Sequence, residues 1–242
     1  MKLAPLGLLA FSFAVSCGAT TDARPHDMSA NAHASAAAAE ASAAAAHSAQ
    51  YAPGRTVVTK RCGGITRAVG EPCWVTEENP TREHLDEAER HARMAADHRA
   101  ASQALRDAEA RACAGLAPAD RDQSPFFHRA DIVSVEEIAF TRRGPPTART
   151  EPLGTPEGVI ITMRAVPGAT VEVLQRIVDC HLARNAALGH DVPEMAYCPL
   201  VPNGVTATVT PAAGGFAITI RSDDARTAAE IVRRARALKP AS

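Results

Sequence analysis

The chain has 242 residues, with 26 lysines and arginines against 27 aspartates and glutamates, and a net charge of −1 at pH 7. It has no surplus of basic residues and few aromatic ones, so it lacks the basic, aromatic-interleaved patches typical of nucleic-acid-binding proteins. After a short apolar run at its start, no other apolar run reaches the ~18 residues that a transmembrane helix needs. The composition therefore predicts no nucleic-acid partner and no membrane-crossing helix.

The first seventeen residues have the layout of a bacterial secretion signal, in which a positive start precedes an apolar core at residues 3–15. The run Ala14-Val15-Ser16-Cys17 resembles the lipobox of bacterial lipoproteins. This resemblance implies that residues 1–16 are a signal peptide and that Cys17 is lipidated and attaches the mature protein to a membrane. Gly18, where inner-membrane lipoproteins often carry aspartate, favours an outer-membrane lipoprotein that faces the periplasm. An ordinary cleaved signal is the alternative.

Export would place the remaining cysteines in an oxidising compartment, where disulfides form. Besides Cys17 there are five, an odd number, so at least one stays free, binds metal or pairs between chains. Closeness in sequence predicts Cys62–Cys73 and Cys180–Cys198 as disulfides and leaves Cys113 unpaired. Two bridges among five cysteines can be drawn in about fifteen ways, so other pairings stay open.

Residues 17–54 are dominated by alanine, serine and histidine, without apolar periodicity. Such a segment cannot bury a core by itself, and an isolated short helix is marginal in water. We therefore expect an Ala/Ser/His-rich tether that becomes helical only transiently. Its histidines, His26, His33 and His47, either bind metal weakly or reflect low-complexity composition.

Residues 55–142 predict a hairpin followed by a long helix. Two β-prone runs, residues 55–62 and 73–78, flank a Gly-rich stretch, and a Cys62–Cys73 disulfide would close the hairpin. Thr81 is the expected N-cap of a helix that runs to Gly115, about 50 Å at 1.5 Å per residue. The apolar line of this helix is thin and rich in alanine, and opposite charges four residues apart support it. We expect it to project outward or to pack against a single partner.

Residues 116–157 predict irregular structure with one strand at 132–140, and the Pro-rich stretch 143–157 predicts a connection between domains. In residues 158–242, alternating apolar residues predict strands near 159–165, 205–210 and 216–221. Thr170 and Ser222 are the expected N-caps of two helices. The predicted fold class is α+β: a disulfide-clipped hairpin and a long Ala-rich helix, followed by a β-α-β-β-α two-layer sandwich with both helices on one face.

The long helix carries a seven-residue repeat of polar side chains, with His84, His91 and His98 at equivalent positions and Met94 between the last two. The stretch HARMAADH resembles the HxxMxxxH segments of the periplasmic silver-binding proteins of silver- and copper-resistance operons. That resemblance implies His91, Met94 and His98 as ligands of Cu(I) or Ag(I). Residues seven apart on a helix lie ~10.5 Å apart, so one ion cannot bind both His84 and His91, or both His91 and His98. Residues three or four apart can meet, so Met94 could form a two-ligand site with either His91 or His98. His84 with Glu87 would suit a harder ion, and only weakly. The alternative is an Ala-rich helix whose histidines only pack.

Candidate catalytic residues do not form a known motif. Asp120, Asp122, Ser124 and His128 cluster in the sequence without a nucleophile elbow, a phosphate loop or an HExxH zinc motif. Cys180 and its neighbour His181 would point ~100° apart on a helix and cannot act as a nucleophile–base pair. The sequence therefore predicts that the protein is not an enzyme; the alternative is an envelope hydrolase that uses His128 with Asp120 or Asp122.

These observations predict a lipid-anchored cell-envelope protein that serves as a non-catalytic binding or scaffold module, without a cofactor. Its expected partners are the membrane, through Cys17, and another envelope protein. The alternatives are a periplasmic protein that binds copper or silver and an envelope hydrolase of unknown type.

Overall fold

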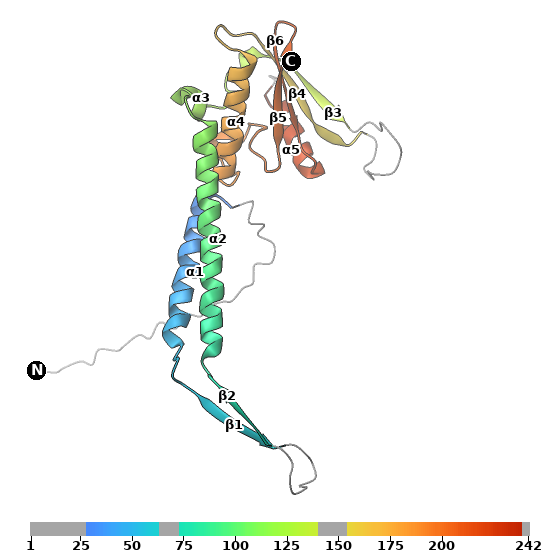
Figure 1. Ribbon diagram of the computed structural model, residues 1–242. Helices are drawn as coiled ribbons and strands as arrows, with labels where there is room; N and C mark the ends of the chain where they lie inside the picture. The colour runs from blue at the N-terminus through green and yellow to red at the C-terminus, as the bar shows by residue number, and fades with distance from the viewer. Residues whose placement is uncertain (1–27, 63–72, 140–153, 239–242) are drawn as a thin grey trace, which may run out of the picture.

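The computed structural model describes residues 28–62, 73–139 and 154–238. The chain forms a head and a long stalk, and a β-hairpin lies at the end of the stalk remote from the head (Figure 1). The elements in chain order are α1 (Ala30–Gln50), β1 (Val57–Cys62), β2 (Cys73–Glu78), α2 (Arg82–Ala112), α3 (Pro118–Asp122), β3 (Ile132–Ala139), β4 (Pro156–Arg164), α4 (Val171–Ala187), β5 (Thr206–Ala212), β6 (Gly215–Arg221) and α5 (Ala225–Arg236). None of the helices in these ranges is long and apolar enough to cross a membrane.

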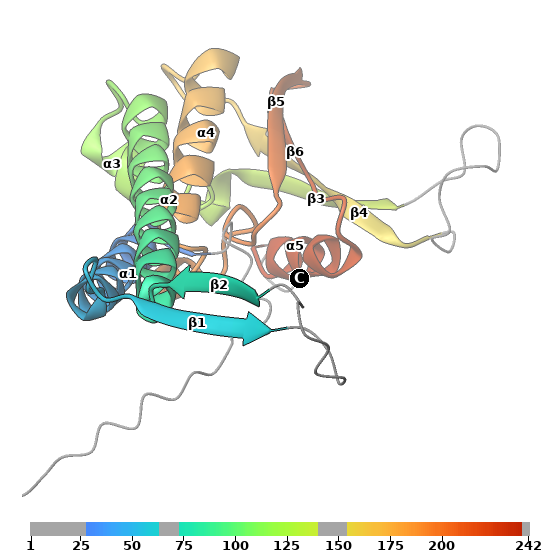
Figure 2. The same cartoon turned by 60° about the horizontal axis from the view of Figure 1, so that its bottom comes forward.

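The stalk is an antiparallel pair of helices, α1 and α2, which lie side by side along the whole of α1 (Figures 1 and 2). The expectation of a tether at residues 17–54 is therefore wrong for residues 30–50. Ser29 caps α1, its hydroxyl accepting a hydrogen bond from the Ala32 backbone N–H at 3.1 Å. The helix is stable here because α2 covers one of its faces, which the local sequence does not reveal.

The β-hairpin is joined to the stalk through a small polar cluster. Thr81 is the N-cap residue of α2, as expected, but its hydroxyl makes no capping bond to that helix. Instead it accepts a hydrogen bond from the Ala52 backbone N–H at 3.0 Å, and the Asn79 amide donates to the Ala52 carbonyl at 2.8 Å. These bonds hold the chain leaving α1 beside the chain entering α2.

The hairpin itself pairs β1 with β2 in antiparallel register, with Cys62 opposite Cys73. The expected Cys62–Cys73 disulfide is confirmed. Every residue of both strands is exposed. The described residues of the hairpin therefore form no buried core, and the disulfide and the strand pairing hold the two strands together.

The head is a two-layer sandwich, which confirms the α+β class. Its antiparallel sheet has the order β3-β4-β6-β5. Val159, Ile161, Ile218 and Ile220 point from the central strands into the core, where they pack with residues of α4 and α5, including Val178 and Ile231. Both helices therefore cover one face of the sheet.

The predicted β-α-β-β-α order of residues 158–242 is present, and β3 extends it. This strand pairs with β4, so the Pro-rich stretch 143–157 connects neighbouring strands of one sheet rather than two domains. Most of that stretch, up to residue 153, lies outside the described residues. Thr170 caps α4 as expected, whereas Asp224 rather than Ser222 caps α5, accepting from the Thr227 N–H at 2.8 Å.

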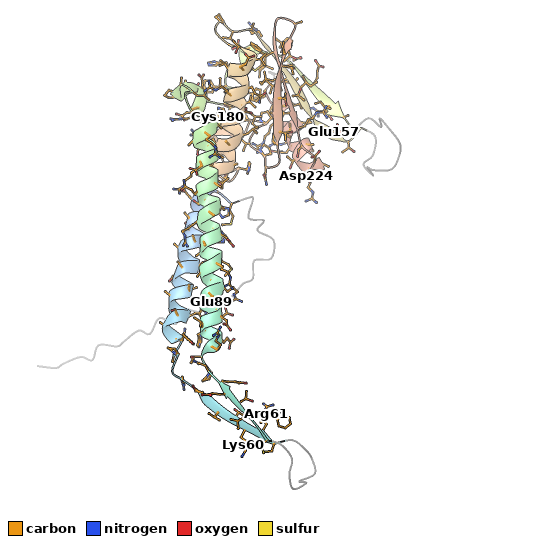
Figure 3. The ribbon with its side chains drawn as sticks, in the orientation of Figure 1. Lys60, Arg61, Glu89, Glu157, Cys180 and Asp224 are labelled. Atoms are coloured by element: carbon orange, nitrogen blue, oxygen red, sulfur yellow. A yellow bond between two sulfur atoms is a disulfide. The ribbon has the colours of Figure 1, made fainter. Side chains whose placement is uncertain are left out.

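A second disulfide fastens the head to the stalk. Cys113, the residue that ends α2, is bonded to Cys180 in the middle of α4 (Cys180 is labelled in Figure 3). The predicted Cys180–Cys198 pair is therefore wrong, and Cys198 is a free, buried thiol. Closeness in sequence misled the pairing because α2 brings Cys113 back against α4 from 67 residues away.

Candidate functional site

Titratable side chains from α1 and α2 meet in three successive layers between the helices. His33 Nδ1 lies 2.9 Å from His98 Nδ1, Glu40 Oε2 lies 2.6 Å from His91 Nδ1, and His47 Nδ1 lies 3.5 Å from His84 Nδ1. Each step of seven residues forward along α1 is matched by a step of seven backward along α2. Five of the nine histidines in the sequence thus lie at this one interface. We call it the titratable interface.

Small residues separate these layers and let the helices approach closely. They repeat every seven residues, and all but Ala44 are buried: Ala30, Ala37 and Ala44 on α1, and Ala88, Ala95 and Ser102 on α2. The Ser102 hydroxyl donates a hydrogen bond to the Ala30 backbone carbonyl at 2.8 Å. A side chain as short as serine can reach the facing backbone only where the two helices pack tightly. Among the five imidazoles of this interface, His33 is buried at 2% exposure and the other four are half-buried.

Within the titratable interface, His91 faces three side chains, those of Glu40, His47 and Glu87. Its ring stacks on that of His47, with centroids 5.4 Å apart and planes 14° apart. Its Nδ1 faces Glu40, and its Nε2 lies 3.9 Å from Glu87 Oε2. Glu87 also contacts Arg90. One ligand atom each from His47, Glu87 and His91 lie within 4.8 Å of one another, so these three residues could hold a metal ion.

The ligand set expected from the sequence is not gathered in one place. His91 faces Glu40 and His47, whereas His98 faces His33 one layer away. Met94 is half-buried. The seven-residue separation of His91 and His98 thus keeps them in different layers, as the helix geometry requires.

Sequence reasoning missed the contribution of α1. The signal was present, because His33, Glu40 and His47 repeat at the same seven-residue spacing as His84, His91 and His98. Two helical segments with equal polar repeats, joined by a hairpin, place those repeats opposite each other in an antiparallel pair.

The free thiol of Cys198 lies in the core of the head. The Ser124 hydroxyl donates to its Sγ at 3.2 Å, and burial raises the pKa of the Cys198 thiol. A buried thiol held in its neutral form is a poor nucleophile.

The residues of the hydrolase alternative lie in the head. Asp120 and His128 line one hollow of about 250 Å³, but in the described parts of the chain no hydrogen bond joins their side chains. Asp122 instead binds Arg184 at 2.6 Å and Arg121 at 3.1 Å, and these partners lower the pKa of its carboxyl. The Ser124 hydroxyl is committed to Cys198. These contacts do not form a nucleophile–base pair.

The hairpin at the end of the stalk is the other distinctive surface. It exposes large apolar side chains, among them Trp74 at 59% and Val58 at 64%. Lys60 and Arg61 lie beside them at the far end of the molecule (Figure 3). A two-stranded sheet exposed on both faces is marginally stable in water without a cross-link or a partner, which the Cys62–Cys73 disulfide supplies in part.

No protein-family model, curated protein or solved structure matches this chain.

Proposed function

We propose that this protein is a lipid-anchored cell-envelope protein and a non-catalytic binding module, in which the stalk presents the β-hairpin to a partner protein at a distance from the head. The observation that carries the proposal is the hairpin itself. All residues of its two strands are exposed, a disulfide joins the strands, and they lie at the end of the molecule remote from the head (Figure 1).

The lengths of the elements support a role in spanning distance. The 31 residues of α2 extend ~46 Å, and the six residues of β1 add ~20 Å. The chain enters α1 at the head end of the stalk, where Ser29 lies against Gly189. From Cys17 to Ser29 the chain can reach at most ~40 Å. An anchor at Cys17 would thus keep the head end of the stalk within ~40 Å of the membrane, and the hairpin lies at the opposite end of α2 (Figure 1).

The surface of the hairpin supports a protein partner. An exposed tryptophan beside an arginine is typical of residues that bind other proteins, because aromatic and arginine side chains contribute most at interfaces. Trp74 is directly opposite Arg61 in the strand register, and Val75 is opposite Lys60.

Two measurements test the proposal. The variant Cys17→Ser should move the protein from the membrane fraction to the soluble fraction, and equal fractionation of the two forms would contradict the anchor. A photo-crosslinking residue at Trp74 should yield one discrete adduct in intact cells, whereas the same residue at Glu89, exposed on the stalk (Figure 3), should not. Equal labelling from both positions would contradict a role of the hairpin in binding.

A further inference from the structure

We propose that the stalk binds a divalent transition-metal ion, Zn²⁺ or Cu²⁺, between its two helices, with His47, Glu87 and His91 as ligands. Glu87 and His91 are four residues apart on α2 and so share a face of that helix, while His47 comes from α1. The ion would therefore join two segments that are about forty residues apart in the sequence. This proposal is independent of the anchor and of the function assigned to the hairpin.

The spacing of the ligand atoms is close to what such an ion needs. A tetrahedral Zn²⁺ with ligands at 2.0–2.2 Å holds them ~3.4 Å apart. The three atoms already lie within 4.8 Å, so movements of roughly 1 Å would bring them to this spacing. One of the two stacked imidazole rings would also turn, because the lone pair of each nitrogen lies in the plane of its ring. Glu87 would give up its contact with Arg90, an exposed ion pair that contributes little.

The contact between Glu40 and His91 is what distinguishes this site from a chance cluster. A metal-bound histidine almost always donates its other ring N–H to a carboxylate or a carbonyl, which fixes the tautomer. Here His91 Nδ1 lies 2.6 Å from Glu40 Oε2, while Nε2 of the same ring faces Glu87. With Nδ1–H donating to Glu40, the lone pair of Nε2 is directed to the side where the other ligands lie.

The ligand types select the ion. Two imidazoles and one carboxylate suit Zn²⁺ and Cu²⁺, whereas Cu(I) and Ag(I) prefer thioether and thiolate ligands. The three ligands include neither a thioether nor a thiolate, which argues against the soft ions that the sequence resemblance implies. His91 and Glu87 keep 19% and 27% of their side-chain surface exposed, so an ion can enter from solvent. A water molecule can take the fourth position of a tetrahedral ion.

Titration of the purified full-length chain, prepared without a polyhistidine tag, tests the site. We expect one equivalent of Zn²⁺ to bind, and Co²⁺ in its place to give the visible absorption bands of a tetrahedral site. His47→Ala and His91→Ala should each weaken Zn²⁺ binding at least ~10-fold, and Glu40→Gln ~10–100-fold. His98→Ala, which removes the equivalent histidine of another layer, is the matched control and should leave the affinity unchanged.

Three results would overturn the proposal. The first is the absence of saturable binding below ~100 μM free Zn²⁺. The second is equal loss of affinity in His98→Ala and His91→Ala. The third is binding of Cu(I) or Ag(I) that requires Met94 but not His47.

Far-UV circular dichroism checks that each variant keeps its helices. If His91→Ala does not, Glu87→Gln removes a ligand at the rim, with Glu89→Gln on the same helix as its control.

Discussion

Cys113 at the end of α2 is bonded to Cys180 in the middle of α4, so one covalent bond fixes the stalk to the head. Arg176, one turn earlier on α4, donates to the Ala114 carbonyl at 2.6 Å and reinforces the same junction. The direction in which the stalk leaves the head is thus set by α4, the helix that also covers β5 in the sandwich.

The double variant Cys113→Ala/Cys180→Ala should destabilise the head. In the chain-entropy model, a cross-link across 67 residues contributes about 4 kcal/mol, and measured values are typically 2–4 kcal/mol. Urea unfolding followed by far-UV circular dichroism would measure the loss. The matched control is Cys62→Ala/Cys73→Ala, which opens a loop of 11 residues at the remote end of the stalk. Equal midpoints for the first variant and the wild type would contradict a structural role for this bond.

Close packing of the stalk depends on the small residues between the titratable layers. Ala95 is 1% exposed at the centre of the helix pair, so Ala95→Leu should force α1 and α2 apart at a cost of about 1–3 kcal/mol. Thermal unfolding followed at 222 nm should show an earlier loss of helix. The neighbouring Ala96→Leu is the control, because Ala96 is exposed and leucine is a good helix former. A stalk that tolerates both changes equally would not be packed through its alanines.

The head should lose stability in mild acid because of His181. This residue is fully buried on α4, its Nε2 faces the Asp120 carbonyl at 3.2 Å, and burial lowers the pKa of its imidazole. Among the described residues, no hydrogen-bond partner faces its Nδ1. The unfolded chain therefore takes up a proton near pH 6.5 that the folded head does not, and stability falls as the pH drops below that value.

Urea midpoints between pH 8 and pH 5 measure this effect. The variant His181→Gln should show a smaller decrease over this range than the wild type, even if it starts from a lower stability. Parallel pH profiles for the two proteins would contradict the assignment of the acid sensitivity to His181.

The parts of the fold that were predictable from sequence are those whose pattern is complete within the segment. Alternating residues such as Val159 and Ile161 identify β4, and the interval between Thr81 and Gly115 delimits α2 within a few residues. The Cys62–Cys73 bond was predictable because a hairpin brings near neighbours together. In each case the residues that determine the structure are adjacent in the chain.

The parts that were not predictable depend on a partner far away in the chain. Helix α1 has alanine and histidine where a self-sufficient amphipathic helix has leucine, so only the presence of α2 makes it stable. The same holds for Cys113, which meets Cys180 only after the stalk returns to the head, and for β3, which joins β4 across the Pro-rich stretch. The proposed metal ligands differ from the expected ones for the same reason, because His47 of α1 lies against His91 only once the two helices pair.

Gly158 marks a point where two strands approach too closely for any side chain. A Cβ atom added there would lie 2.0 Å from the Ile220 backbone carbonyl oxygen on β6. Gly158→Ala should therefore separate β4 from β6 at this end of the sheet. The free energy of unfolding should fall by at least about 1–3 kcal/mol, the cost typical of overpacking. Gly54→Ala, at a position with no atom within 4 Å, should leave the stability unchanged.

Because Gly158 lies opposite Arg221 and next to the ion pair of Arg221 with Glu157 at 3.1 Å, amide hydrogen exchange in β6 should rise first near Arg221. Uniform exchange along β6 would mean that the strain spreads through the whole sheet instead.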